Sequence, residues 1–546
     1  MIKILLIKKN NKIKTLVFVS LMLIFILPTN IVHSEFDRNL FKKDFETEKY
    51  MIHSKGWKPL TLNGFGKESN IATRGMTIYN DELYIGTQNT KFPKLFQNTA
   101  PELLKIISKF LPNKLPEFLH RTMAFQLLLR VVHLLRSITV KAVMHSAVKN
   151  SEGCEIWKYN YTTDSLIQVV GDESSFGMKS GFNYSLNCLA SVLTVFKDKL
   201  YVSTWSTPIG SLKQPNRKGC EIWRFDGKNW EQVVGHKAPF VKGGFGESDN
   251  VGICSMKVFN DYLYASTMNW DPALFGGFEI WRSNDGVHWS KVVANGFKQN
   301  MSRTDLLSGV TNTYGWCMEV FQNQLYVGTF NSCYRFLRNT GMGCQLWRTH
   351  SGTNWTKVDL PTGVEGIYQD GFGEPENYGI RTLIVYNDEL YVGTATNLLY
   401  EKGFEIWKYD GLNWKPVIGD DVLDVEPCDF EYNGFGNPLN NYAWSMNVTS
   451  DNKLWIGTAN GRIKNLMEPV TVGGEIWCFD GENWIPIVKN EIGEKPNGFG
   501  NEKNEGVRSI IEYPKDSGNI IVGTFKLIST RLLLPQEGCE VWMRNI

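Results

Sequence analysis

A phrase that recurs at regular spacing is the feature that most constrains the fold of this chain. It consists of an apolar strand, a short polar turn and Leu-Tyr-x-Gly/Ser-Thr or a close variant. Successive copies start 117, 63, 62, 65, 63 and 64 residues apart, and the first interval is long by about one insertion of 54 residues. Such self-similarity indicates a repeat architecture whose units bury their apolar faces against one another. The copies start at Met76, Leu193, Met256, Met318, Leu383, Met446 and Ile510.

Each unit is expected to hold four short strands. Asn-Asp or a similar pair joins the first two strands, and Asp-Gly often joins the last two, which are both hairpin signals. Between these hairpins stands Gly-x-Glu-Ile-Trp or a near copy, as at 219–223 and 403–407. Seven units of four strands predict an all-β fold, a seven-bladed β-propeller over residues 55–546. Thirteen of the 18 Trp belong to the repeat, and we expect them to pack between blades.

The two ends of the repeat predict how the ring closes. The last unit stops four residues after Trp542, where its fourth strand should begin, and a surplus strand at 56–62 precedes the first complete unit. We expect this N-terminal strand to complete the last blade, because an open array would leave exposed strand edges.

A third phrase precedes each unit. Gly-Phe is followed by an Asn that lies six residues before the strand start. Because this Asn occurs in every unit, we expect it to hold the Gly-Phe turn by bonding backbone groups rather than to bind a ligand. The seven residues are Asn70, Asn187, Asn250, Asn312, Asn377, Asn440 and Asn504.

The first 34 residues are typical of a secretory signal. Five Lys without an acid precede an apolar run that stops at Pro28, and small or aliphatic residues then precede Ser34. Residues 35–54 form the expected linker to the propeller. The protein is therefore expected to be secreted or displayed at the cell surface, and an uncleaved N-terminal membrane anchor is the alternative.

Cysteine and histidine usage gives no sign of a metal or cofactor. Ten Cys occur without a CxxC motif, the eight His show no metal-ligand spacing, and no dinucleotide or Walker motif is present. We expect neither metal nor cofactor. One repeated position, filled by Cys in four units and by Phe or Gly in the others, is expected to hold a buried side chain rather than a disulfide: Cys154, Cys220, Phe278, Cys344, Phe404, Gly474 and Cys539.

Charge is segregated along the chain. The insertion in the first unit, residues 91–150, has ten Lys/Arg and two Glu, a net of +8, and the signal carries +5. Since the whole chain is +2, the remainder is 2 − 8 − 5 = −11. The insertion is predicted to form helices with an apolar face, which would contact an anionic membrane or pack on the acidic propeller as a lid. The near-neutral total argues against a nucleic-acid partner.

One turn carries a family resemblance. The segment 283–289, Ser-Asn-Asp-Gly-Val-His-Trp, resembles the Asp-box of sialidase-like β-propellers, and weaker copies lie at 226–230, 410–414 and 480–484. The resemblance implies a propeller in which Asp285 and Trp289 are structural, because Asp-boxes occur in enzymes and in non-enzymatic scaffolds alike.

The long loops on one face are the expected binding surface. The position two before each strand start should ring the central axis there, and it holds Arg74, Ser191, Cys254, Trp316, Arg381, Trp444 and Arg508. With Tyr314 and Tyr442, these side chains predict a funnel where Arg would bind a carboxylate or sulfate and aromatic faces would stack on a sugar. The resemblance implies the same, since sialidases hold a carboxylate with three Arg. The alternative is that the Arg pair with loop acids such as Glu374, Glu376 or Glu505.

The sequence therefore predicts an exported, non-catalytic propeller that binds a glycan or a protein through its loop face. Two alternatives stay open. One is a sialidase-like glycosidase or polysaccharide lyase that uses the Arg/aromatic funnel. The other is a membrane-surface scaffold docked by residues 91–150. No catalytic residue and no oligomeric state is assigned.

Overall fold

The structure is a computed structural model of the 546-residue chain. It describes residues 56–91, 151–206, 218–269, 276–297, 312–331, 343–362, 370–396, 402–419, 432–463, 469–470, 472–526 and 537–545. The expected signal (1–34), the linker (35–54) and, apart from Lys91, the expected helical insertion (91–150) lie outside these ranges.

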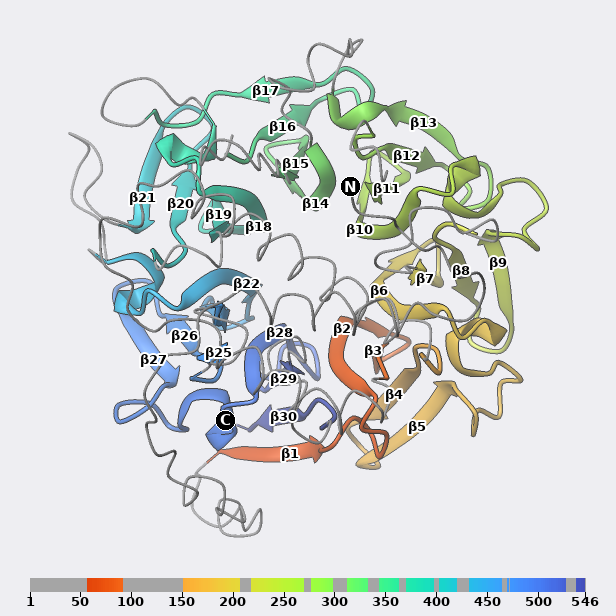
Figure 1. The fold of residues 1–546 in the computed structure, drawn as a ribbon, viewed down its shortest axis with the longest axis horizontal. Helices are drawn as coiled ribbons and strands as arrows, with labels where there is room; N and C mark the ends of the chain where they lie inside the picture. Colours follow the sequence, from red (N-terminus) through yellow and green to blue (C-terminus); the bar gives the residue numbers. More distant parts are fainter. Residues whose placement is uncertain are drawn as a thin grey trace, which may run out of the picture.

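The described chain is all-β and has the strand arrangement of a β-propeller. Its strands fall into antiparallel sets of four arranged around a central axis (Figure 1). In chain order the first three sets are β2 (Asn70–Tyr79), β3 (Glu82–Asn89), β4 (Ile156–Asn160) and β5 (Ser165–Val170); β6 (Asn187–Phe196), β7 (Lys199–Ser206), β8 (Ile222–Phe225) and β9 (Trp230–Val234); and β10 (Asn250–Phe259), β11 (Tyr262–Asn269), β12 (Ile280–Ser283) and β13 (Ser290–Val293).

The remaining sets follow the same plan. They are β14 (Asn312–Phe321), β15 (Gln324–Asn331), β16 (Leu346–Thr349) and β17 (Thr356–Val358); β18 (Asn377–Tyr386), β19 (Glu389–Thr396), β20 (Ile406–Tyr409) and β21 (Trp414–Ile418); β22 (Asn440–Val448), β23 (Leu454–Asn460), β26 (Ile476–Phe479) and β27 (Trp484–Val488); and β28 (Asn504–Glu512), β29 (Ile520–Lys526), β30 (Val541–Arg544) and β1 (Trp57–Thr61). A small separate hairpin is formed by β24 (Arg462–Ile463) and β25 (Pro469–Val470).

The N-terminal strand completes the last set, as the repeat predicts. β1 pairs antiparallel with β30, with Trp57 opposite Arg544. Glu494 reinforces this junction, because it accepts a hydrogen bond from Trp57 Nε1 at 2.9 Å and also binds Arg544. Neighbouring sets are further joined by one bridge each between an innermost strand and the second strand of the preceding set, and the bridge Ala72–Phe525 joins the last set to the first.

Turns and core follow from the repeated phrases. Asn80 and Asp81 both have positive φ (49° and 59°), as a tight hairpin turn of the primed type requires. The apolar cores lie between neighbouring sets, where one buried cluster includes Tyr84 of the first set and Leu200 of the second. Side chains from consecutive sets therefore share each core, which explains why one unit cannot fold alone.

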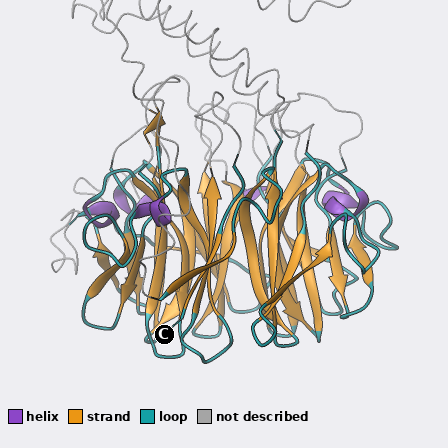
Figure 2. Ribbon diagram, turned by 90° about the horizontal axis from the view of Figure 1, so that it is seen from below, coloured by secondary structure: helices purple, strands orange, loops and turns teal. Residues whose placement is uncertain are grey.

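Short 3-10 turns mark the entry to most innermost strands. They gather at one edge of the disc (Figure 2). Their bounds are η3 (Ser180–Asn183), η4 (Gly243–Gly246), η5 (Asn295–Phe297), η7 (Gly371–Gly373), η8 (Asn433–Gly436) and η9 (Asn497–Gly500). No helix within the described residues is long and apolar enough to cross a membrane.

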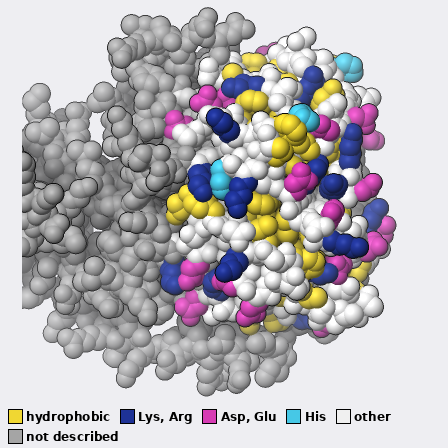
Figure 3. All heavy atoms as spheres, turned by 90° about the vertical axis from the view of Figure 1, so that its right-hand side faces the viewer, with side chains coloured by type: hydrophobic (Ala, Val, Ile, Leu, Met, Phe, Trp, Pro, Cys, Tyr) yellow, Lys and Arg dark blue, Asp and Glu magenta, His cyan; other side chains and the backbone are white. Residues whose placement is uncertain are grey.

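The outer surface carries both signs of charge. In the view of Figure 3, basic and acidic side chains alternate among apolar groups and no single-sign region dominates. Three Arg stand on innermost strands around the central axis, where the candidate site is built.

Candidate functional site

Each innermost strand carries a β-bulge at the same place. The register of β18 with β19 shifts between Ile380 and Thr382, so Arg381 is left out of the ladder. Single residues are left out in the same way in β6, β10, β14, β22 and β28, whereas the shift in β2 leaves out both Arg74 and Gly75. A bulge leaves the extra residue unpaired and re-aims its side chain. The residues at these shifts are the seven expected to ring the axis: Arg74, Ser191, Cys254, Trp316, Arg381, Trp444 and Arg508. We call them the bulge ring.

Three Arg of the bulge ring, from the first, fifth and seventh sets, face one another across the axis. Burial and then the charge of Arg381 lower the pKa of Arg74 to about 9. Burial, Arg381 and Arg74 together hold the pKa of Arg508 well below its usual value. Burial also lowers the pKa of Arg381. Arg74 and Arg508 thus each respond to the charge of Arg381, which indicates that the three cations share one region around the axis.

No carboxylate of the described residues neutralises these three Arg. Two of the three loop acids considered as partners are engaged elsewhere, since Glu374 binds Lys402 at 2.5 Å and Glu376 lies 3.9 Å from the same amine. The Nε groups of Arg381 and Arg508 are buried and have no hydrogen-bond partner in the structure. Arg74 alone has a polar partner, donating from Nε to Gln88 at 2.7 Å.

Each of the three Arg of the bulge ring instead lies over the indole of a Trp. The guanidinium carbon of Arg381 is 4.8 Å from the ring centroid of Trp316, and that of Arg508 is 5.5 Å from Trp444. Arg74 lies 5.6 Å from the ring of Trp205 in β7, a residue that sequence reasoning missed. Trp316 and Trp444 were expected to offer free faces to a ligand, whereas here they support guanidinium groups by cation–π contact.

Glycines in the next set make room for these Trp. A Cβ added at Gly379 would lie 2.2 Å from Cζ3 of Trp316, and one at Gly506 would lie 2.2 Å from Cζ3 of Trp444. The indoles therefore pack directly against backbone. Because Cβ–carbon contacts of this length do not occur, only Gly fits these two positions without moving the Trp.

Aromatic side chains form a continuous arc beside Arg381. Tyr314 stacks on Phe330 at 4.5 Å, and Phe330 meets the edge of Tyr378 at 4.8 Å. The hydroxyls of Tyr378 and Tyr442 are in contact, and Tyr442 lies 6.0 Å from Trp316. Tyr314 and Tyr442 were expected here. Tyr378 was not, although it occupies a second bulge of β18, between Asn377 and Gly379.

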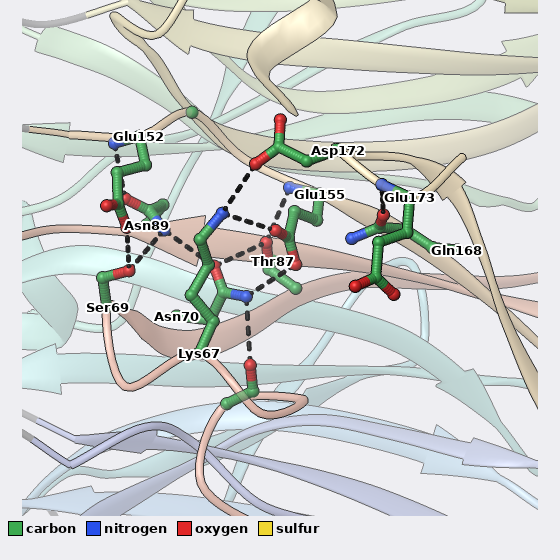
Figure 4. A network of polar contacts seen from close by, with 12 residues as sticks. Lys67, Ser69, Asn70, Thr87, Asn89, Glu152, Glu155, Gln168, Asp172 and Glu173 are labelled. Atoms are coloured by element: carbon green, nitrogen blue, oxygen red, sulfur yellow. Dashed lines mark hydrogen bonds and ion pairs between the residues drawn. The ribbon is translucent and has the colours of Figure 1, made fainter. Parts of the chain in front are cut away.

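The repeated Asn belong to a buried network away from the bulge ring. Asn70 Nδ2 donates to the carbonyl of Gly64 at 3.0 Å and to Glu155 at 2.8 Å, while its Oδ1 accepts from Asn89 (Figure 4). All seven Asn amides donate to the first residue of the Gly-Phe pair, at 2.8–3.1 Å. The acceptors are the carbonyls of Gly64, Gly181, Gly244, Gly296, Gly371, Gly434 and Gly498.

The same network fixes the Gly-Phe turn through its aromatic ring. Phe435 has φ of 58°, a conformation that bulky residues seldom adopt, and it stacks on Trp477 at 4.4 Å. Trp477 Nε1 donates in turn to Glu475 at 3.0 Å, and Glu475 accepts from Asn440 at 3.0 Å. A Phe–Trp stack of this kind occurs in every set.

The segment that resembles an Asp-box forms the turn between β12 and β13. Asp285 Oδ1 accepts from the backbone N–H groups of Val287 and His288 at 2.8 Å each. Burial opposes ionisation of Asp285, but the hydrogen bonds from His288, Val287 and Ser283 outweigh it and lower its pKa. Trp289 opens the following segment and meets Phe245 edge-on at 5.6 Å. Both residues lie at the outer edge of their set, far along the sheet from the bulge ring.

Cysteines and metal-ligand types form no centre in the described part of the chain. Cys154, Cys220, Cys344 and Cys539 are buried free thiols, as the repeat predicts, and burial raises the pKa of Cys539 to about 12. Among the described residues, no group of three or more His, Cys, Asp or Glu could hold a metal ion.

Comparisons with known proteins give only distant similarities. No family model and no curated protein matches the chain. Similar solved structures include an α-L-arabinanase from Penicillium chrysogenum complexed with arabinobiose, with 10% identity over 75% of this chain and 94% of that one and a TM-score of 0.37. A GH74 enzyme from Niastella koreensis has 12% identity over 89% of this chain and 55% of that one, with a TM-score of 0.42. The WD40 β-propeller domain of Doa1 has 9% identity over 90% and 98%, with a TM-score of 0.38. These values are too low to support a statement about ligand or reaction, and the fold assignment rests on the strand pairings.

Proposed function

We propose that this protein is an exported, seven-bladed β-propeller that binds an anionic ligand, an acidic glycan or a peptide carboxylate, at the bulge ring without turning it over. One observation carries the proposal: Arg74, Arg381 and Arg508 converge on the axis while no carboxylate of the described residues neutralises them. Buried cations are costly unless they are paired. An anion supplied from outside would remove that cost, and Arg is the side chain best suited to grip carboxylate or sulfate.

Binding without turnover is favoured by the composition of the ring. A retaining or inverting glycosidase needs two carboxylates flanking the bond that it breaks. The bulge ring has Arg, Trp, Ser and Cys at its seven positions and holds neither Asp nor Glu. The Trp behind each Arg keeps the guanidinium in place, which limits the side-chain entropy that binding has to overcome.

The test is a binding and turnover comparison of wild-type protein with Arg381→Met. An acidic glycan array and a panel of C-terminal peptides are the probes, and Arg282→Met is the matched control, because Arg282 also lies over an aromatic ring, Tyr262 at 4.4 Å, but belongs to β12. We expect anionic members to bind wild-type and control protein and to lose at least tenfold in affinity for Arg381→Met. Equal binding by all three proteins, or binding of neutral glycans alone, would sink the proposal.

The basic segment 91–150 supports a separate proposal, membrane contact. Its net charge of +8 suits an anionic lipid surface. Flotation with phosphatidylserine vesicles, with and without this segment, tests it. Equal flotation of the two proteins would remove this role.

A further inference from the structure

Arg381 and Arg508 stand in two copies of the same arrangement of a Trp, a Gly and an Arg. In the first, Trp316 of β14 packs against Gly379, and Arg381, two residues further along β18, lies over the indole. In the second, Trp444 of β22 packs against Gly506, and Arg508, two residues further along β28, lies over that indole. Each copy consists of a bulge-ring Trp in one set and a Gly-x-Arg segment in the next.

Arg381 and Arg508 stand on two sets that have one set between them, and each stands on a fixed backbone. Each Gly bridges to the preceding set, Gly379 opposite Phe330 and Gly506 opposite Ala459, so the backbone on which each Arg stands is fixed by the sheet. Each guanidinium is held over the indole of its own copy rather than free to swing as a surface Arg is. A rigid fork binds one carboxylate or sulfate in a bidentate manner.

The third Arg adds a different kind of site to the same ring. Arg74 is bound to Gln88 and lies over Trp205, whose Nε1 is buried without a hydrogen-bond partner. Its own strand has Ala72 where the two copies have Gly. The described side chains around the axis thus contribute three positive charges and several unused N–H donors, and one singly charged anion would leave two of the charges without a counterion.

We infer that the ligand of the bulge ring carries at least two anionic groups, spaced to reach Arg381 and Arg508 separately, with Arg74 available for a third. This inference rests on the proposed function and narrows its substrate class to polyanions: an oligosaccharide with several carboxylate or sulfate groups, or an acidic peptide end with neighbouring carboxylates. A sugar with a single acid group would satisfy one copy of the construction only.

The experiment measures affinity as a function of the number of carboxylates. The probes are acetate, the linear dicarboxylates from succinate to adipate, and tricarballylate, each titrated calorimetrically at matched ionic strength, since screening changes every charge interaction. We expect the best dicarboxylate to bind wild-type protein at least tenfold more tightly than acetate, and the tricarboxylate to bind at least as well as the best dicarboxylate.

Two variants separate the copies. Arg508→Met and Arg381→Met should each abolish the advantage of dicarboxylate over acetate, while Arg282→Met, off the axis, should keep it; urea midpoints verify that all of them fold. If acetate binds wild-type protein as tightly as the dicarboxylates, the polyanion inference is wrong although an anion site survives. If no carboxylate binds and the acidic glycan array is also silent, the proposed function itself fails.

Discussion

Replacing Arg381 by Met should stabilise the ligand-free protein, which is an unusual outcome for a buried substitution. The Arg381 side chain is 6% exposed, has an unpartnered Nε and shares the axis with two other cations. Exchanging buried ionic groups for apolar side chains of similar volume is often neutral or stabilising by about 1–4 kcal/mol. The substitution removes the desolvation of one guanidinium and its repulsion of Arg74 and Arg508.

The losses are smaller than this gain. The cation–π contact with Trp316, 4.8 Å from the ring centroid, is worth roughly 0.5–2 kcal/mol. No hydrogen bond at Nε is lost, so no partner is left unsatisfied. Taking the middle of both ranges, the free energy of unfolding should rise by on the order of 1 kcal/mol.

Urea unfolding followed by Trp fluorescence measures the effect in a buffer without carboxylate, phosphate or sulfate. The unfolding midpoint of Arg381→Met should lie above that of wild-type protein, with the slope unchanged. The Arg282→Met control, whose Nε is also buried without a partner, should not be stabilised, because Arg282 donates from another N–H group to the Tyr264 hydroxyl at 3.3 Å and lies over Tyr262. Addition of tricarballylate should offset this difference, since a ligand at 100 times its wild-type Kd adds about 2.7 kcal/mol to wild-type protein but only about 1.4 kcal/mol to a variant that binds it tenfold more weakly. A midpoint lowered by Arg381→Met in the anion-free buffer would refute the reasoning, because it would show that the protein itself neutralises this charge.

Three further outcomes are expected. Asn187→Ala should lower the free energy of unfolding by about 1–3 kcal/mol in a urea titration, because it removes the donor at 2.7 Å from the buried Glu221 carboxylate, whose Oε2 then keeps the bond from Trp223 Nε1 at 3.1 Å; a change under about 0.5 kcal/mol would contradict the role assigned to the network. Gly379→Ala should displace Trp316 and weaken dicarboxylate binding at least tenfold in calorimetry, whereas unchanged affinity would show that the indole does not position the cation. Anion affinity should fall as the pH rises through the lowered pKa of Arg74, about 9, and that of Arg508, since only a protonated guanidinium attracts the anion; an affinity that does not change between about pH 7 and about pH 10 would contradict the role of these Arg.

Much of the propeller frame could be predicted because the same sequence phrases recur seven times along the chain. The Asn-Asp turns, the Glu-Ile-Trp phrase and the surplus strand at 56–62 all have direct structural counterparts, and β1 pairs with β30 as expected. What the sequence does not reveal is which repeated side chains meet. Asn187 and Glu221 are 34 residues apart, so the bond that joins two phrases becomes visible only when strands from the same set are aligned.

The conformation of the Gly-Phe turn lay beyond sequence reasoning for a physical reason. Phe at positive φ costs energy in isolation, so local preference argues against the conformation that Phe435 adopts. The stack on Trp477 and the bond from Asn440 to the carbonyl of Gly434 hold it there, and Glu475 ties the two together by accepting from Asn440 and from Trp477. Tertiary contacts thus override a local preference, and they do so in each set, with Gln345 in place of Glu in the fourth.

The site was only half predictable, for a related reason. The position two before each strand start falls at a register shift of each innermost strand, and the sequence did not predict this bulge, because a bulge moves the period-2 pattern of a strand by one residue without any other signal. Tyr378 and Trp205 were missed because they belong to a second bulge and to a second strand. The signal that could have found the Trp contacts is the pair of Gly-x-Arg segments, each lying 62 or 63 residues after a Trp.

The contrast between frame and ring gives the strongest reason to place function at the axis. Buried positions of the frame repeat the same few residues, and most are held by hydrogen bonds or stacking, although a few buried polar atoms such as Asn504 Oδ1 have no partner. The seven bulge positions share one backbone geometry yet hold four different residue types, and they concentrate charge that the described protein leaves unpaired. Unpaired buried cations give a fold no stability. Such cations therefore persist only where the rest of the propeller is stable enough to tolerate them. The propeller frame holds these unpaired cations on rigid bulges, so the site is preorganised for an anion. The free energy that the burial of the cations costs the free protein becomes available for binding when a ligand neutralises the bulge ring.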